Sequence, residues 1–131
     1  MRVLLLIGSL TVLLMSCSQT TKGNRDFLEG HSEVQYRIDE ERDGRKSVVY
    51  FIFHDDGTWV NHYMNQRDSL VPFEPIDVVF DKTYQYWGDS MYVWGYTWDV
   101  TKHDEDSFEL RMHGSNRVWH LAKTNYPVVE R

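Results

Sequence analysis

The sequence has little of three things: it holds one cysteine, three prolines and, after residue 14, no long run of apolar residues. A single cysteine cannot form an internal disulfide, so a hydrophobic core must hold the fold together. Apolar residues do not recur at helical spacing over any long stretch, so long helices are not expected. The one apolar run, residues 3–14, is shorter than the roughly 20 residues that a membrane-spanning helix needs.

Basic residues are also in the minority. The chain carries 20 Asp and Glu against 14 Lys and Arg, a formal net charge of −6. The basic residues are not gathered into one stretch, and an acidic domain repels a phosphate backbone. We therefore expect no nucleic-acid partner. A length of 131 residues suits one domain with one core.

The N-terminal segment has the order of a secretory signal peptide over residues 1–16, with Arg2 before the apolar run. The run ends in Leu14-Met15-Ser16-Cys17, which resembles the lipobox of bacterial lipoproteins. The resemblance implies cleavage before Cys17 and attachment of fatty acyl chains to it, which would explain the lone cysteine. Several acyl chains together give stable membrane anchoring. The alternative is an ordinary signal peptide with an incidental cysteine.

The same resemblance implies a location. Ser18 rather than Asp follows Cys17, and in Gram-negative lipoproteins this favours sorting to the outer membrane. Residues 17–26 form a polar tether without the acidic run that some Bacteroidetes lipoproteins use for export to the cell surface. We therefore expect a lipid-anchored protein of the cell envelope, on the outer membrane and facing the periplasm.

From residue 27 on, apolar and polar residues alternate and turn residues recur about every 8–12 positions, which is typical of antiparallel strands. Phe27 and Leu28 are expected to start the fold as a short helical turn that closes one end. Asp-Gly pairs at 43–44 and 56–57 predict tight hairpins, and residues 65–76, with two prolines, predict a long loop. The predicted strands are 32–40, 46–54, 58–64, 77–81, 83–87, 91–100, 108–112 and 117–123.

Seven or eight short strands in sequence order predict an all-β fold. We expect a single antiparallel up-and-down β-barrel over residues 27–124, followed by a tail at 125–131, because a closed barrel removes the exposed edges of a sheet. A membrane-spanning barrel is the rival closed form, but its strands face lipid with apolar residues. Most strands here expose charge, so a soluble barrel fits better.

Four segments resemble the small lipocalin-like domains of bacterial lipoproteins, particularly those of Bacteroidetes. The segments are residues 53–59 (FHDDGTW), 97–100 (TWDV), 106–111 (DSFELR) and 118–121 (VWHL). The likeness covers roughly residues 28–123. It implies a barrel whose interior could hold a small apolar ligand.

No set of catalytic residues stands out. No serine lies in a Gly-x-Ser-x-Gly elbow, and lipidation would remove the thiol of Cys17. The acids at 55–56 and 104–106 lie in predicted turns, where solvation explains them. His54 and His62 lie on the two arms of one predicted hairpin, too far apart to share a metal ion. We expect no enzymatic activity, no metal and no cofactor.

The stretch 91–100 (MYVWGYTWDV) is the candidate ligand-binding segment. As one strand, it would place its four alternate aromatic rings on one side, and Asp99 on the other side indicates that the rings face inward. The rings either fill a packed core or line a cavity for a small apolar or aromatic ligand. With two residues of the next strand, the candidate ligand-binding residues are Tyr92, Trp94, Tyr96, Trp98, Phe108 and Leu110.

The alternative function is a non-catalytic protein-interaction or structural module of the cell envelope, with a filled barrel. In that case the loop 65–76 would expose Leu70, Val71 and Phe73 to an envelope protein partner. The two hypotheses differ in whether the barrel interior or its surface carries the function.

Overall fold

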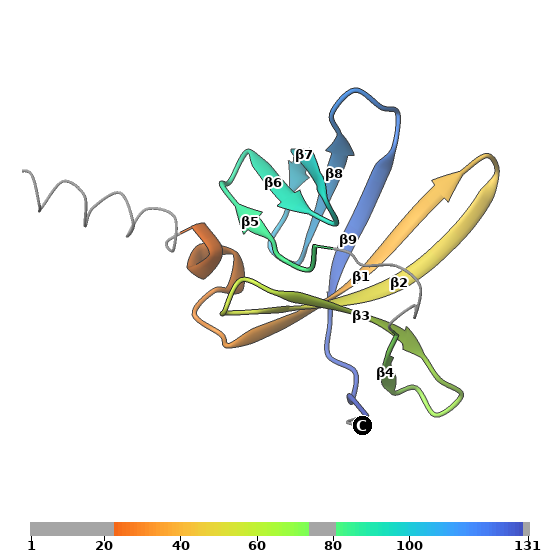
Figure 1. Ribbon diagram of the computed structural model, residues 1–131. Helices are drawn as coiled ribbons and strands as arrows, with labels where there is room; N and C mark the ends of the chain where they lie inside the picture. Colours follow the sequence, from red (N-terminus) through yellow and green to blue (C-terminus); the bar gives the residue numbers. More distant parts are fainter. Residues whose placement is uncertain (1–22, 74–80, 130–131) are drawn as a thin grey trace, which may run out of the picture.

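A computed structural model of the chain describes residues 23–73 and 81–129 (Figure 1). They hold a short helix, 23–28, and nine strands, which confirms the predicted all-β class. The predicted signal peptide and Cys17 lie outside the described residues. The strands are β1 (Glu33–Arg42), β2 (Arg45–His54), β3 (Trp59–Met64), β4 (Leu70–Pro72), β5 (Gln85–Tyr86), β6 (Ser90–Val93), β7 (Tyr96–His103), β8 (Ser107–Met112) and β9 (Val118–Thr124).

All nine strands belong to one antiparallel sheet in the order β4-β3-β2-β1-β9-β8-β7-β6-β5. From β1 to β4 and from β5 to β9 each strand pairs with its successor, and β1 pairs with β9. The sheet curls into a half-barrel (Figure 1), and β4 and β5 are its two edges. Among the described residues no ladder joins these edges, so the expected closed barrel is not what this part of the chain forms.

One end of the gap between the edges is nevertheless bridged. Thr58, at the start of β3, forms an isolated antiparallel bridge with Thr83, just before β5. Asp56 Oδ1 accepts hydrogen bonds from the amide and the hydroxyl of Thr58, at 3.0 and 2.6 Å. Asp81 Oδ1 accepts the same two bonds from Thr83, at 3.1 and 2.6 Å. Two similar Asp-x-Thr turns thus fasten this end of the half-barrel.

The short helix plugs the same end, as predicted from Phe27 and Leu28. The Phe27 ring lies among the rings of the inner face, with centroids 5.1 Å from Phe53 and 5.4 Å from Tyr36. Asn24 fixes the helix to the chain before β5, since its Nδ2 donates to Tyr84 O at 3.3 Å and its Oδ1 accepts from the Tyr86 amide at 2.9 Å. No helix among residues 23–73 and 81–129 is long and apolar enough to cross a membrane.

Both predicted hairpins are confirmed. In the first, Arg42 pairs with Arg45, and the turn residues Asp43 and Gly44 have φ angles of 52° and 74°, as a type I′ turn requires. In the second, Phe53 pairs with Trp59 across a turn that contains Gly57. Strand alternation then directs Phe51 and Phe53 inward and Tyr50 and Ile52 outward.

The prediction of one strand over residues 91–100 is wrong. Trp94 and Gly95 have φ angles of 58° and 78° and form a two-residue turn, so that Val93 at the end of β6 pairs with Tyr96 at the start of β7. A two-residue turn preserves the alternation along the chain, and a bulky ring rarely adopts the left-handed conformation. The sequence of this hairpin therefore has the alternation of one continuous strand and no typical turn pair that would reveal the turn.

The loop prediction for residues 65–76 is also wrong in part. Leu70–Pro72 forms the edge strand β4 against β3. Leu70 is fully buried with Tyr50 and Ile52 in a second apolar cluster on the outer face. The C-terminal segment covers it: the Leu70 amide donates to Pro127 O at 2.7 Å. Residues 74–80, which include all but the last residue of the strand predicted at 77–81, lie outside the described residues.

Candidate ligand-binding site

The end of the half-barrel opposite the helix holds a cavity of 130 Å³ on the inner face. Figure 1 shows the β1–β2 hairpin and the β8–β9 turn extending at this end. We call this site the cup, and its principal residues are Glu40, Phe51, Asn61, Trp94, Arg117 and Trp119. Arg117 also lines an adjoining cleft of 530 Å³, together with Tyr96 and Met112, so the cavity and the cleft meet at one side chain.

Glu40 is the buried charge of the cup. It follows Tyr36 and Ile38 in the inward-facing row of β1, and its side chain is 9% exposed. Its Oε1 accepts a hydrogen bond from Arg117 Nε at 2.7 Å, and its Oε2 accepts one from the indole N–H of Trp119. A buried carboxylate is stable only with such partners. Both oxygens of Glu40 are therefore occupied by the protein itself.

The ion pair with Glu40 uses only one of the N–H donors of Arg117. The guanidinium carbon lies 4.6 Å from the centroid of a Trp94 ring, a cation–π distance. Within the described part of the chain, the side chain donates through Nε and makes no hydrogen bond through either Nη. An arginine carries five N–H donors, so donors remain unused on a side chain that lines both the cavity and the cleft.

The wall of the cup is aromatic. The Trp119 ring lies 4.3 Å from Trp98, 5.6 Å from Trp94 and 5.7 Å from Phe51, measured between centroids. Phe51 in turn stacks on Trp59 at 4.4 Å. The indole N–H groups behind the wall have protein partners, since Trp98 donates to Val93 O and Trp119 to Glu40. These indoles therefore need no ligand to satisfy them.

The side-chain oxygen of Asn61 has no hydrogen-bond partner among the described residues. It lies on β3 opposite Phe51, and its Oδ1 is the one buried side-chain nitrogen or oxygen without a hydrogen bond among the described residues. An unsatisfied buried acceptor costs about 1–3 kcal/mol, and native structures contain few of them. The Asn61 carboxamide oxygen therefore costs the fold stability that no hydrogen bond among the described residues offsets.

The structure separates the six residues that the sequence grouped. Tyr96 borders the cleft and Trp94 the cavity, and Trp98 lies behind the aromatic wall. The other three lie elsewhere. Phe108 and Leu110 are buried in the core, and Tyr92 faces outward, where its hydroxyl donates to Asp81 at 2.8 Å. Sequence reasoning missed five of the six cup residues: Glu40, Phe51, Asn61, Arg117 and Trp119.

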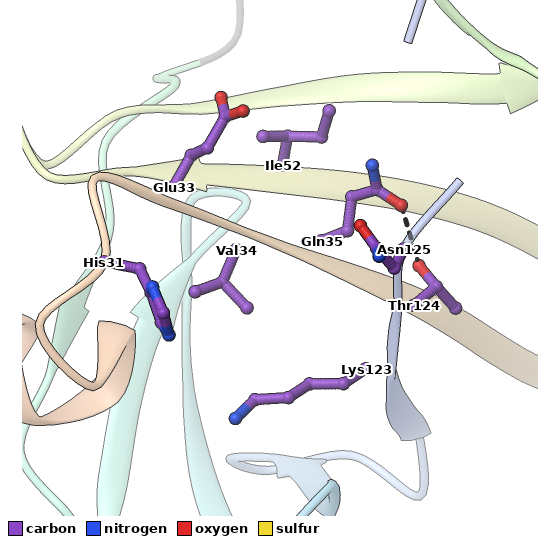
Figure 2. A pocket seen from close by; sticks show the side chains of 8 residues that line it. All are labelled: His31, Glu33, Val34, Gln35, Ile52, Lys123, Thr124 and Asn125. Carbon is purple, nitrogen blue, oxygen red and sulfur yellow. Dashed lines mark hydrogen bonds between the residues drawn. The ribbon is translucent and has the colours of Figure 1, made fainter. Parts of the chain in front are cut away.

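A second hollow lies on the outer face, between the start of β1 and the end of β9 (Figure 2). Several of its polar side chains are paired with one another or with nearby segments of the protein. Gln35 Oε1 accepts from Thr124 Oγ1 at 3.1 Å and from the Tyr126 amide at 2.8 Å, and Lys123 forms an ion pair with Glu29 at 2.9 Å. These hydrogen bonds hold the C-terminal segment against β1 and occupy polar groups that a ligand would need.

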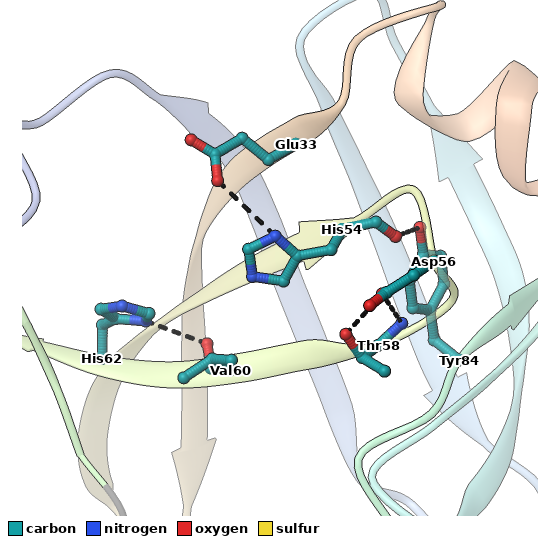
Figure 3. Close-up of polar contacts among 7 residues, drawn as sticks. All are labelled: Glu33, His54, Asp56, Thr58, Val60, His62 and Tyr84. Atoms are coloured by element: carbon teal, nitrogen blue, oxygen red, sulfur yellow. Dashed lines mark hydrogen bonds and ion pairs between the residues drawn. The ribbon is translucent and has the colours of Figure 1, made fainter.

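The two histidines of the β2–β3 hairpin also contact other groups of the protein (Figure 3). His54 Nδ1 lies 3.6 Å from a Glu33 oxygen, and His62 Nδ1 lies 3.0 Å from Val60 O. Burial lowers the pKa of His62 below its ordinary value. In the described residues no three His, Cys, Asp or Glu side chains gather as metal ligands would, and the absence of a metal in the whole protein stays a prediction.

Comparisons with protein-family models, with curated proteins and with solved structures found nothing that matches this chain. The likeness to lipocalin-like lipoprotein domains therefore stays a prediction, carried only by the sequence segments that suggested it.

Proposed function

We propose that this chain is a non-catalytic binding protein that takes a small ligand into the cup. One observation carries the proposal: a cavity lined partly by aromatic rings is also lined by Arg117 and Asn61, two side chains with hydrogen-bonding groups that no described residue uses. Binding sites of small molecules typically combine apolar walls with a few directed polar groups. The cup has this composition, and the outer hollow does not.

Binding fits the chemistry of the cup better than catalysis does. A catalytic carboxylate must exchange a proton or attack a substrate, but both oxygens of Glu40 are held by Arg117 and Trp119. Among the described residues that line the cavity there is no cysteine and no histidine. Ser47 has the one hydroxyl side chain in this described lining, which offers it no histidine as a base.

We further propose that the protein is anchored in the outer membrane through acyl chains on Cys17 and faces the periplasm. The supporting observation is the Leu-Met-Ser-Cys segment at residues 14–17. Metabolic labelling of the full chain with a palmitate analogue tests it. Label should enter the protein and should be absent from a Cys17→Ser variant, and equal labelling of both would refute the anchor.

Tryptophan fluorescence tests the binding function, because Trp94, Trp98 and Trp119 surround or back the cavity. The purified full chain should show a saturable change in emission with at least one compound from panels of small rings, fatty acids and haem. The change should be reduced in Trp94→Phe and kept in Trp87→Phe, which removes an exposed ring outside the cup. No response to any compound would refute the proposal.

A surface patch supports the second candidate function, a protein-interaction module. The rings of Tyr63 and Phe73 pack edge to face at 6.2 Å beside the edge strand β4, and they are 44% and 48% exposed. Val71 is half-buried, and Leu70 belongs to the core. Phe73→Ser should then weaken capture of an envelope protein without lowering the melting temperature, whereas Leu70→Ser should lower it. Unchanged capture by Phe73→Ser would remove this candidate.

A further inference from the structure

The end of the half-barrel that the short helix closes, which we call the plugged end, carries an exposed aromatic ring. We propose that Trp87 at this end rests on a zwitterionic lipid surface, so that the cup, at the opposite end, faces away from the membrane. This inference rests on the proposed acyl anchor at Cys17. Three properties lead to it: the position of Trp87, the length of the tether and the charge near the ring.

Trp87 differs from the other four tryptophans in its exposure. It is 50% exposed, whereas three of the others are buried and Trp94 is half-buried at the cup. Its neighbour Tyr86 faces inward on β5, so strand alternation turns the Trp87 ring outward. The indole N–H of Trp87 makes no hydrogen bond with the described residues. An exposed ring with such a polar tip suits the boundary between lipid and water, where tryptophan is enriched.

The chain that would lead from the lipid enters the fold beside Trp87. Figure 1 shows the helix next to β5, and Gly23 at the start of the helix approaches so closely that a Cβ there would overlap the carbonyl oxygen of Tyr86. Asn24 holds this contact in place, since its side chain makes hydrogen bonds with Tyr84 O at 3.3 Å and with the Tyr86 amide at 2.9 Å. The first residues of the helix are therefore fixed to the backbone that carries Trp87.

The tether between the proposed anchor and the helix is short. Six residue steps (23 minus 17) separate Cys17 from Gly23, and at roughly 3.6 Å per residue they span at most about 22 Å. Acyl chains on Cys17 would hold that residue at the lipid surface. A short tether gives its two ends an effective concentration in the millimolar range. A contact of Trp87 with lipid that is too weak to recruit a free protein would therefore be populated in the anchored one.

The cup lies further from the anchor than Trp87 does. β1 leads from Glu33, near the helix, to Glu40 in the cup, a path of roughly 23 Å at about 3.3 Å per residue. The cup could therefore reach the lipid surface only if the tether were almost fully extended. The plugged end needs no such extension, so it is the end that the anchor brings to the membrane.

The charge near Trp87 favours lipids without net charge. Burial raises the pKa of the Tyr86 hydroxyl, and the carboxylates of Asp26 and Asp89 raise it further, so both acids lie near this neighbour of Trp87. Arg25 on the helix offsets one of these two negative charges. The remaining negative charge would repel an anionic lipid surface. Phosphatidylcholine and phosphatidylethanolamine are zwitterionic and do not oppose the contact.

The test uses the acylated protein, purified from membranes and reconstituted into phosphatidylcholine vesicles whose acyl chains carry bromine, which quenches nearby indoles. We expect the tryptophan emission to be lower than in the same vesicles without bromine. Trp87→Phe should lose most of this quenching, because the other four rings are buried or lie at the cup. Equal quenching of the wild type and of Trp87→Phe, or none in the wild type, would overturn the proposal.

Two further variants test the orientation of the protein. Phe73 is as exposed as Trp87, at 48%, but it follows β4, which lies across the half-barrel from the helix (Figure 1). The double variant Trp87→Phe with Phe73→Trp should therefore recover no quenching, and recovery would overturn the proposal. Trp94→Phe should keep the quenching of the wild type. Loss of quenching in Trp94→Phe would mean that the cup faces the lipid, and would also overturn the proposal.

The lipid class and the anchor are tested separately. Adding anionic phosphatidylglycerol to the brominated vesicles should not strengthen the quenching, and a stronger effect would overturn the choice of a zwitterionic surface. If the protein carries acyl chains and floats with the vesicles but shows no quenching that depends on Trp87, the contact is wrong and the anchor stands. If the protein carries no acyl chains, the anchor is wrong and this inference fails with it.

Discussion

The two ends of the half-barrel are built from the same inward-facing rows of residues and differ in what they leave unsatisfied. At the plugged end, Phe27 fills the space between rings, and Asn24 makes hydrogen bonds with both atoms of its carboxamide. At the open end, aromatic rings border a cavity, and the carboxamide oxygen of Asn61 has no hydrogen-bond partner among the described residues. We therefore expect the plugged end to contribute more to stability, and the proposed binding function assigns the open end to a ligand.

The two ends also differ in buried charge. The rings around Phe27 belong to phenylalanine and tyrosine, whereas the cup contains the buried pair of Glu40 and Arg117. A buried ion pair gives little net stability compared with apolar packing, because both ions lose their hydration. An ion pair at this position is easier to understand as an arrangement that orients Arg117 over Trp94 than as a source of stability.

The largest effect is expected at the plugged end. Phe27→Ala should lower the free energy of unfolding by about 4 kcal/mol, because it removes a buried ring that contacts several others. Urea unfolding measures the loss. The same substitution at Phe73, whose ring is half exposed, should cost under about 1 kcal/mol. Equal losses at the two positions would show that the helix does not hold this end together.

The ion pair of the cup gives the next largest effect. Glu40→Leu should destabilise the protein by about 3 kcal/mol, since it leaves the Arg117 guanidinium partly buried without its counter-charge. The double variant Glu40→Leu with Arg117→Met should recover much of this loss, because two apolar side chains need no charged partner. Chemical unfolding of the single and double variants forms a cycle. Simple additivity of the two losses would contradict this account of the pair.

The part of the fold that local signals encode could be predicted from the sequence. Asp43-Gly44 and Asp56-Gly57 combine turn residues with strong alternation on both sides, and both hairpins are present. At Trp94-Gly95 only the glycine is a typical turn residue, because tryptophan seldom adopts a positive φ. The edge strand β4 was missed because the prolines of its segment indicate a loop, although Pro72 is tolerated where only one side of a strand is paired.

The cup could not be predicted as a whole, because its residues come from five separate segments of the chain. Trp94 was among the candidates on the strength of the aromatic row alone. Glu40 did leave a signal: it continues the inward-facing row of Tyr36 and Ile38, where a charge is unexpected. Arg117 precedes β9 by one residue and Asn61 lies in a mixed strand, so nothing local marks either of them. The long-range pairing of β1 with β9 brings Glu40 beside Trp119.

The sharpest comparison of the two ends uses one substitution at two positions. Asn61→Leu should stabilise the ligand-free protein by about 1 kcal/mol, because it replaces an unpaired buried acceptor with an apolar group of similar size. Asn24→Leu should destabilise it by about 1–2 kcal/mol, because it breaks the hydrogen bonds to the Tyr84 carbonyl and the Tyr86 amide. Thermal and urea unfolding of both variants measure the two signs.

Opposite signs are the essential result, since the chemical change is identical and only the surroundings differ. A loss of stability in both variants would mean that the Asn61 carboxamide supports the fold, and the inference that it awaits a ligand would lose its basis. A gain in stability for Asn61→Leu, together with weaker binding of a ligand found by the fluorescence screen, would show the exchange of stability for function that binding sites often display. Asn61 would then be a residue retained for what it binds rather than for what it holds together.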